Sequence, residues 1–161
     1  MPSTIKAVLL DVGGVLVELD GMPSLSALLN SGESHEVLHR RWMASGAVIA
    51  HETGKISAVE FAERLAVELR LPIRSTAFLE AFRAWPRGLR HGTLDMLDRI
   101  RPEYVVAALS NTSAAHWERI TALGLARRFQ RAYLSFETGC LKPDRDAFDA
   151  ALADLNLHPS E

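Results

Sequence analysis

A short apolar run near the start of the chain constrains the fold more than any other feature. Residues 5–12 read IKAVLLDV, and Gly13 and Gly14 follow directly. A continuous run of this length, rich in Val, Ile and Leu, is typical of a strand covered on both faces in a parallel sheet. The paired glycines predict a tight turn after the strand. Asp11 gains nothing from burial at the end of such a strand, so the sequence marks it as a functional residue.

Strands and helices are predicted to alternate along the rest of the chain. Further strands are expected at residues 104–109 and 132–135, and helices at residues 93–100, 113–123 and 145–155. Residues 23–85 have a helical period that predicts three or four helices, with starts marked by Ser34 and by a capping box from Ser57 to Glu60. Asn111 or Thr112 is expected to cap the helix that begins at residue 113.

This alternation predicts an α/β fold built on a Rossmann-like open parallel sheet with right-handed crossovers. The helices of residues 23–85 come between the first and second strands of that sheet, so they form an insert. We therefore expect residues 1–18 and 88–161 to form the α/β core and residues 19–87 to form an inserted helical domain.

The composition is that of one soluble globular domain. The chain has 161 residues, 48% of them apolar, and a formal net charge of -2. A charge so close to neutral argues against nucleic acid or an anionic membrane surface as a partner. Cys140 is the single cysteine, which excludes an internal disulfide, and no signal-peptide pattern precedes the first apolar run. We therefore expect a cytoplasmic protein.

Polar side chains follow the predicted strands at the points where they end. Asp11 ends the first strand, Ser110 and Asn111 follow the second, and Lys142 comes shortly after the third. Ligands of open α/β sheets bind beyond the carboxyl ends of the strands, so we expect these residues in one pocket. A carboxylate can attack phosphorus to give an aspartyl-phosphate, while hydrogen-bond donors, a lysine and Mg²⁺ neutralise the phosphate oxygens. The pattern therefore predicts a phosphoryl-transfer site with Mg²⁺ as cofactor.

The order of these residues resembles the haloacid dehalogenase-like (HAD) hydrolase superfamily, from residue 5 to the end of the sequence. The family's aspartate motif is similar to LLDVGGVLV, its Ser or Thr motif to LSNT, and its lysine motif to GCLKPD. Residues 51–57, HETGKIS, resemble a stretch in the helical cap of the small sugar-phosphate phosphatases, a subgroup that includes the bacterial alpha-glucose-1-phosphate phosphatase.

The resemblance implies a role for each of the marked residues. Asp11 would be the nucleophile and a magnesium ligand, and the main-chain carbonyl of Gly13 would be a second ligand. Ser110, Asn111 and Lys142 would hold the phosphate. Residues 19–87 would form the cap, which selects a small phosphorylated metabolite as substrate.

The sequence departs from the family pattern at two places. Most phosphatases of the superfamily have a second aspartate two residues after the nucleophile as general acid and base, and this chain has Gly13 there. The resembling subgroup also often has glycine at this position. The missing acid would therefore favour substrates with good leaving groups, such as anomeric phosphates, or leave its task to a cap residue or water. The family's acidic fourth motif should follow LNLHPSE, where the sequence ends. We therefore expect an incomplete Mg²⁺ site, impaired activity of the chain as a fragment, and an open apolar edge at residues 5–12 that favours a homo-oligomer.

Alternative functions remain open. A haloacid dehalogenase would use the same nucleophile on carbon without a metal, although those enzymes usually have an aromatic residue at the position of Gly13. A non-catalytic binding module would keep the fold alone. Residues 35–39, HEVLH, match a zinc-protease pattern, for which solvated surface histidines are the simpler interpretation. His116 is also expected on a helix surface, and the aromatic residues of the insert, Trp42, Phe61, Phe82 and Trp85, are expected in its core.

Overall fold

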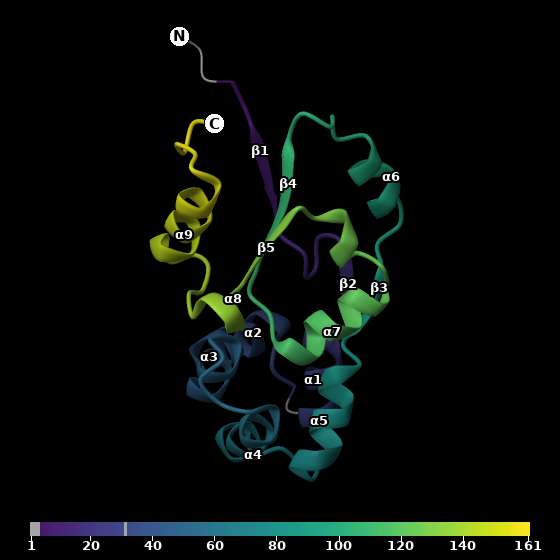
Figure 1. Cartoon of the computed structure of the whole chain (residues 1–161). Coiled ribbons are helices and arrows are strands. Elements are labelled where there is room, and N and C mark those ends of the chain that lie inside the picture. The colour runs from purple at the N-terminus through teal and green to yellow at the C-terminus, as the bar shows by residue number, and fades with distance from the viewer. Residues whose placement is uncertain (1–3, 31) are drawn as a thin grey trace.

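The computed structural model describes residues 4–30 and 32–161 (Figure 1). Within this part of the chain, a three-stranded parallel sheet has the order β1-β4-β5, with β1 at Ala7–Leu10, β4 at Val105–Ser110 and β5 at Arg131–Leu134. The strand β1 pairs with β4 up to Leu10 opposite Ala108, and β4 pairs with β5 up to Ser110 opposite Leu134. The predicted α/β fold with an open parallel sheet is confirmed, and the carboxyl ends of the strands lie along one edge.

The central strand β4 is apolar because both of its faces are covered. Val106 and Ala108 pack in one cluster of buried residues, and Ala107 and Leu109 pack in another. Successive side chains of a strand point to opposite faces, so a continuous apolar run is what a strand inside two layers requires. The first cluster includes residues of α6 (Thr93–Asp98) and α7 (Ala114–Ala122), and the second includes residues of α9 (Arg145–Leu155).

Two short elements connect the main ones on the C-terminal side, the 3₁₀ helix η1 (Ala126–Arg128) and the helix α8 (Ser135–Thr138). The sequence did not predict α8, which begins directly where β5 ends. The expected cap of α7 was also wrong by one or two residues. Ser113, rather than Asn111 or Thr112, is the N-cap, and its hydroxyl accepts the N–H of His116 at 3.4 Å. Asn111 and Thr112 make other contacts, described below.

The segment between β1 and β4 is mostly helical. Its helices are α1 (Gly21–Leu29), α2 (His35–Ala44), α3 (Gly46–Glu52), α4 (Ala58–Leu69) and α5 (Ser75–Arg83). The predicted caps are confirmed, since the hydroxyl of Ser34 accepts the N–H of Val37 at 3.3 Å and that of Ser57 accepts the N–H of Glu60 at 3.1 Å. These helices share one buried cluster, which contains the aromatic residues expected in the core, Trp42, Phe61, Phe82 and Trp85, together with Phe78. No helix in the described ranges is long and apolar enough to cross a membrane.

A pair of short antiparallel strands, β2 (Val17–Leu19) and β3 (Pro86–Leu89), connects the sheet to these helices. Beside the pair, the N–H of Asp20 donates to the carbonyl of Trp85 at 3.1 Å, and the Asp20 carboxylate is ion-paired with Arg87. The sequence did not predict the pair, because proline and glycine disfavour strands and the pairing spans most of the helical segment. The division into a core of residues 1–18 and 88–161 and an insert of residues 19–87 stays a prediction.

A glycine brings the helical segment against the sheet side of the molecule. Gly54, just after α3, has a φ of +71°, and a Cβ added there would overlap the main-chain carbonyl of Phe136 in α8. The turn is closed by the N–H of Gly54, which donates to the carbonyl of His51 at 3.0 Å, and by that of Lys55, which donates to Ala50 at 2.8 Å. Only a residue without a side chain combines this conformation with this close approach.

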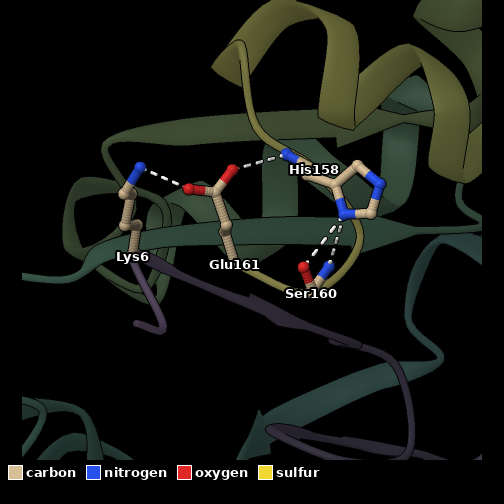
Figure 2. A network of polar contacts seen from close by, with 4 residues as sticks. All are labelled: Lys6, His158, Ser160 and Glu161. Atoms are coloured by element: carbon tan, nitrogen blue, oxygen red, sulfur yellow. Dashed lines mark hydrogen bonds and ion pairs between the residues drawn. The ribbon is translucent and has the colours of Figure 1, made fainter. Parts of the chain in front are cut away.

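The strand β1 lies at an edge of the sheet, as predicted. Its start is contacted by Glu161, whose main-chain carbonyl accepts the N–H groups of Lys6 and Ala7. Figure 2 shows the side chain of Glu161 between its two partners, the ammonium of Lys6 and the N–H of His158, which donates at 2.9 Å. Ile5 is 51% exposed at this edge. The pairing of this edge with a second copy of the chain stays a prediction.

Replacing Gly54 with alanine is expected to destabilise the fold more than the same change at Gly92. Gly92 also has a positive φ, +78°, but no atom lies within 4 Å of an added Cβ. Alanine at Gly92 is therefore expected to lower the free energy of unfolding by about 1 kcal/mol, the cost of the left-handed conformation alone. Alanine at Gly54 should lower it by about 1–3 kcal/mol more, because its Cβ overlaps the carbonyl of Phe136. Urea unfolding of both variants measures the difference, and equal losses would show that the contact with Phe136 is absent.

Candidate active site

The residues that follow the strands meet at the carboxyl edge of the sheet. Asp11 comes one residue after β1, Asn111 one residue after β4, and α8 starts where β5 ends. The turn after Asp11 is compact, because the carbonyl of Val12 accepts the N–H groups of Leu16 and Val17 at 2.9 and 3.0 Å. Gly14, at a φ of +76°, donates its N–H to the carbonyl of Val17 at 2.9 Å. The turn holds the Asp11 carboxylate at the carboxyl edge of the sheet.

The Asp11 carboxylate is paired with Lys142. Its Oδ1 lies 2.8 Å from the Lys142 ammonium and also accepts the N–H of Val12 at 2.7 Å. The lysine side chain is 20% exposed and the aspartate side chain 46% exposed. An ammonium beside a carboxylate that faces solvent can attract an anion to the same place and stabilise negative charge there.

Asn111 fixes the position of Lys142. Its Oδ1 accepts the main-chain N–H of Lys142 at 2.8 Å, and its Nδ2 donates to the main-chain carbonyl of Lys142 at 2.9 Å. Both polar atoms of the amide are thus used on a residue 31 positions away in the sequence. The side chain of Asn111 therefore orients the lysine, and this is the role we assign to it among the predicted phosphate-binding residues.

Ser135 and Ser113 hold the loop between β4 and α7. The hydroxyl of Ser135 accepts the N–H of Thr112 at 2.9 Å and donates to the carbonyl of Thr112 at 3.1 Å. Ser113 caps α7, so the N-terminal end of that helix is held beside Asn111. The free N–H groups and the dipole at a helix N-terminus favour an anion, which strengthens the effect of Lys142.

These groups open into a cavity of about 340 Å³ between the sheet edge and the helical segment. Its polar wall is formed by Asp11, Gly13, Asn111, Thr112, Ser113 and Lys142, and its apolar wall by Leu19, Met22, Trp42, Met43, Phe82 and Trp85. The structure thus brings Asp11, Gly13, Asn111 and Lys142 together, as predicted. Ser110 is 3% exposed and is not among the described residues of the wall, so its contact with a ligand stays a prediction.

His116 lies in this cavity wall rather than on the outer surface of α7, where the sequence analysis expected it. Its ring stacks on Phe82, with centroids 4.1 Å apart, and its Nε2 lies 2.7 Å from the carbonyl oxygen of Phe82. Burial is the main cause that lowers the pKa of His116, to about 4. The sequence could not show this, because Phe82 approaches His116 only through tertiary packing.

Glu52 is a second titratable residue of the wall that the sequence did not single out. It is the last residue of α3, within the quoted stretch HETGKIS. Burial raises the pKa of its carboxyl group to about 7. The only sequence signal for it was the similarity of that stretch to the cap of the small sugar-phosphate phosphatases.

The oxygen donors at the carboxyl edge of the sheet suit Mg²⁺ better than zinc. In the described ranges, no three His, Cys, Asp or Glu side chains converge as a metal site, so the zinc interpretation of HEVLH gains no support. Mg²⁺ commonly keeps several waters and binds through one or two carboxylates together with phosphate oxygens. Asp11 and Gly13 both line the cavity, so a carboxylate and a main-chain carbonyl are available as two of these ligands. The expected shortage of further acidic ligands, with its effect on activity, stays a prediction.

The whole described chain is similar to one family of hydrolases. A sequence model of the haloacid dehalogenase-like hydrolases matches residues 5–161. The chain is also 30% identical, over 168 aligned residues, to a D-ribitol-5-phosphate phosphatase of Bacteroides thetaiotaomicron, covering 98% of this chain and 80% of that enzyme.

Solved structures agree with this match. A HAD-family enzyme of Bacteroides thetaiotaomicron, in complex with magnesium and inorganic phosphate, has a TM-score of 0.75 and 26% identity, covering 97% of this chain and 81% of that one. An L-2-haloacid dehalogenase of Xanthobacter autotrophicus has a TM-score of 0.66 and 18% identity, covering 97% and 67%. The second likeness shows the fold alone.

His116 is expected to make the stability of the chain depend on pH. Its folded pKa of about 4 lies below the value of 6.5 that applies to an unfolded chain, so the unfolded state binds the proton first as the pH falls. The stabilisation is complete above about pH 6.5 and is lost towards pH 4, with about 2 kcal/mol lost between about pH 7.5 and about pH 5. Urea unfolding of the wild type and of His116→Gln at the two pH values measures it.

The comparison isolates His116, because Glu52 titrates in both proteins. The raised pKa of Glu52 acts in the opposite direction, removing stability as the pH rises towards 7. His35→Gln, at an exposed position of α2, is the matched control and should behave as the wild type. The interpretation of His116 is wrong if the His116→Gln variant shows the same pH dependence as the wild type.

Proposed function

This chain belongs to the haloacid dehalogenase-like hydrolase family, and we propose that it is a Mg²⁺-dependent phosphatase of a small phosphorylated sugar or polyol. The observation that carries the proposal is the pairing of Asp11 with Lys142 at 2.8 Å, inside a cavity at the carboxyl edge of the sheet. The similar Bacteroides enzyme named as a D-ribitol-5-phosphate phosphatase supports the substrate class. The similar structure that holds magnesium and inorganic phosphate supports the cofactor.

Asp11 is the proposed nucleophile. Its carboxylate attacks phosphorus, the bond from phosphorus to the leaving oxygen breaks, and an aspartyl-phosphate forms, which water then hydrolyses. Lys142 and the N-terminus of α7 stabilise the charge on the phosphate oxygens during both steps. Asn111 keeps Lys142 in place, since both atoms of its amide are bonded to the lysine main chain.

Mg²⁺ would be held by the Asp11 carboxylate and the main-chain carbonyl of Gly13. When bound, it supplies positive charge beside the phosphate oxygens and so lowers the repulsion between the phosphate and the attacking carboxylate. The glycine matters here because a main-chain carbonyl can approach a phosphate-bound ion more closely where no side chain intervenes.

The helices α1 to α5 are the proposed cap. They supply most of the apolar wall of the cavity through Met22, Trp42, Met43 and Phe82, opposite the polar residues of the sheet edge. A cavity of about 340 Å³ is at the small end of metabolite sites. This arrangement orients the phosphate towards Asp11 and the organic part of the substrate towards the helices, and it limits the substrate to a small molecule.

Phosphate release tests the proposal. The purified wild type, incubated with Mg²⁺ and D-ribitol 5-phosphate or other small sugar phosphates, is expected to release inorganic phosphate, and EDTA should abolish the release. Asp11→Asn removes the nucleophile and should lower kcat by at least about a thousandfold, which is about 4 kcal/mol of barrier. Asp95→Asn, at an exposed position of α6, is the control and should leave the rate unchanged.

Two outcomes would contradict the phosphatase. Hydrolysis of a 2-haloacid that persists in EDTA would assign the metal-independent dehalogenase instead. Binding of a phosphorylated ligand without release of phosphate, by the wild type and by Asp11→Asn alike, would assign the non-catalytic binding module.

Replacing Lys142 with methionine is expected to lower kcat by about 10²- to 10³-fold, because the charge on the phosphate oxygens then loses one of its donors. Methionine keeps an unbranched side chain up to Cε and removes the charged ammonium group. Lys55→Met is the matched control, since Lys55 is exposed after α3 and lies outside the cavity wall. Circular dichroism of both variants checks the fold, and a kcat of Lys142→Met within about threefold of the wild type would remove Lys142 from the mechanism.

A further inference from the structure

The phosphatase needs a proton donor that its nucleophile loop lacks. Gly13 stands two residues after Asp11, where the loop has no acidic side chain. An alkoxide leaving group is a poor one, so the cleavage of a sugar or polyol phosphate requires a proton at the leaving oxygen. A side chain that supplies this proton must line the same cavity as Asp11.

The described wall of that cavity contains five side chains that can exchange a proton: Asp11, His39, Glu52, His116 and Lys142. Asp11 and Lys142 are paired with each other at 2.8 Å. Burial lowers the pKa of His116 to about 4, so its ring is neutral near pH 7, and its Nε2–H donates to the carbonyl of Phe82 at 2.7 Å. His39 is exposed on α2.

Glu52 is the remaining group, and its carboxyl has no hydrogen-bond or ion-pair partner among the described residues. It is partly buried at the end of α3. A carboxyl group that lines a cavity without a partner is available to a ligand. Its burial costs free energy, and no hydrogen bond or ion pair in the described structure offsets that cost.

We infer that Glu52 is the general acid and base of this phosphatase, acting from the helical segment in the cavity that Asp11 also lines. In the first step, Asp11 attacks phosphorus, the bond to the leaving oxygen breaks, and the Glu52 carboxylic acid gives its proton to that oxygen, which leaves as an alcohol. In the second step, water attacks the phosphorus of the aspartyl-phosphate and gives its proton to the Glu52 carboxylate. Asp11 returns as a carboxylate, phosphate leaves, and Glu52 is protonated again. The inference rests on the proposed phosphatase function.

The packing of α3 explains how Glu52 reaches the cavity. His51, the preceding residue, is 6% exposed and stacks on Phe61 in the core of the helices, with ring centroids 4.4 Å apart. Adjacent helical residues point about 100° apart, so a helix that buries His51 turns Glu52 to another side. Gly54 then packs on the main chain of Phe136 in α8, which holds this end of α3 against the sheet side of the molecule. The position of Glu52 is therefore built by packing on both of its sides.

The surroundings of Glu52 favour a carboxyl group that is protonated near neutral pH. Trp42, Met43 and Phe82 line the same cavity, and the burial of the carboxyl group raises its pKa to about 7. A general acid works best when its pKa lies near the working pH, because it is then often protonated and still transfers its proton readily.

None of the charged groups in the described structure around Glu52 pairs with its carboxyl group, so burial alone sets the direction of its pKa shift. The other titratable groups of the cavity wall are the Asp11–Lys142 pair, His116 and His39. On α3 itself, His51 is buried against Phe61. The charged residues on the helices packed against α3 either have partners of their own or are exposed. In α2, Arg40 is paired with Glu36 and Arg41 with Glu33. In α4, Glu68 is bonded to Ser45 and Arg64 is paired with Glu60, and the exposed residues are Glu63 of α4 and Glu137 of α8.

The test compares substrates that differ in their need for the proton. D-ribitol 5-phosphate leaves an alkoxide, whereas p-nitrophenyl phosphate leaves a phenolate that needs no protonation. Glu52→Gln is expected to lower the first-turnover rate on D-ribitol 5-phosphate by about 10²- to 10⁴-fold, with KM changed by less than about threefold. The first-turnover release of p-nitrophenol should stay within about fivefold of the wild type. With the alkyl phosphate, kcat/KM of the wild type is expected to fall above about pH 7, and this fall should be absent in the variant.

The controls separate this inference from the proposed function. Glu63→Gln, on the exposed side of α4, should match the wild type with both substrates. Glu52→Asp keeps an acid and should retain more activity on the alkyl phosphate than Glu52→Gln, which also settles the role if Glu52→Gln folds poorly. Equal rate losses on both substrates, a rise in KM alone, or a loss on the alkyl phosphate in His39→Gln rather than in Glu52→Gln would overturn the role of Glu52. A wild type that releases phosphate from neither substrate would instead overturn the phosphatase itself.

Discussion

The site depends on the two hydrogen bonds by which Asn111 holds the main chain of Lys142. Asp11 follows β1 and Lys142 comes well after β5, so no local feature of the chain brings them together. The in-register parallel pairing of β1 with β4 and of β4 with β5 places three strand ends on one edge, and Asn111 then ties the lysine loop to the end of the middle strand. Because both polar atoms of the Asn111 amide are bonded to the main chain of Lys142, the lysine side chain starts from a fixed position and reaches the Asp11 carboxylate. The charges that the proposed chemistry needs are therefore positioned by the main chain before any substrate binds.

The other half of the cavity is built by different contacts. The strands β2 and β3 join the helical segment to the sheet, and Gly54 lets the end of α3 rest on α8. Inside the segment, the rings of Trp42, Phe61, Phe82 and Trp85 form a common core, and Phe82 also receives the ring of His116 from α7. The apolar and polar residues thus line one cavity, and Glu52, at the end of α3, lines it with them. A proton donor supplied by the helices, in place of the acidic residue absent at Gly13, follows from this arrangement.

The parts of the structure that local sequence determines were predicted well. The strands β1, β4 and β5 were found from their apolar runs, because strands buried on both faces must be apolar throughout. The caps at Ser34 and Ser57 were found because capping is a contact between residues three positions apart. Asp11, Ser110, Asn111 and Lys142 were expected in one pocket because parallel strands share a carboxyl edge, and all of these except Ser110 line the cavity. The features that were missed depend on long-range contacts. The strand β3 forms by pairing with β2 although it contains a proline and a glycine. His116 lies in the cavity wall because its ring contacts Phe82, and Glu52 lines the cavity because of how α3 packs. A local sequence pattern shows none of these contacts.

The covalent bond between Asp11 and phosphorus is tested by a rapid acid quench of the enzyme during turnover of a phosphate-labelled substrate, followed by mass spectrometry of its peptides. We expect the peptide containing residues 7–18 to carry one phosphate, on Asp11. If the label appears as free phosphate without ever being found on this peptide, or is found on another residue, Asp11 is not the nucleophile.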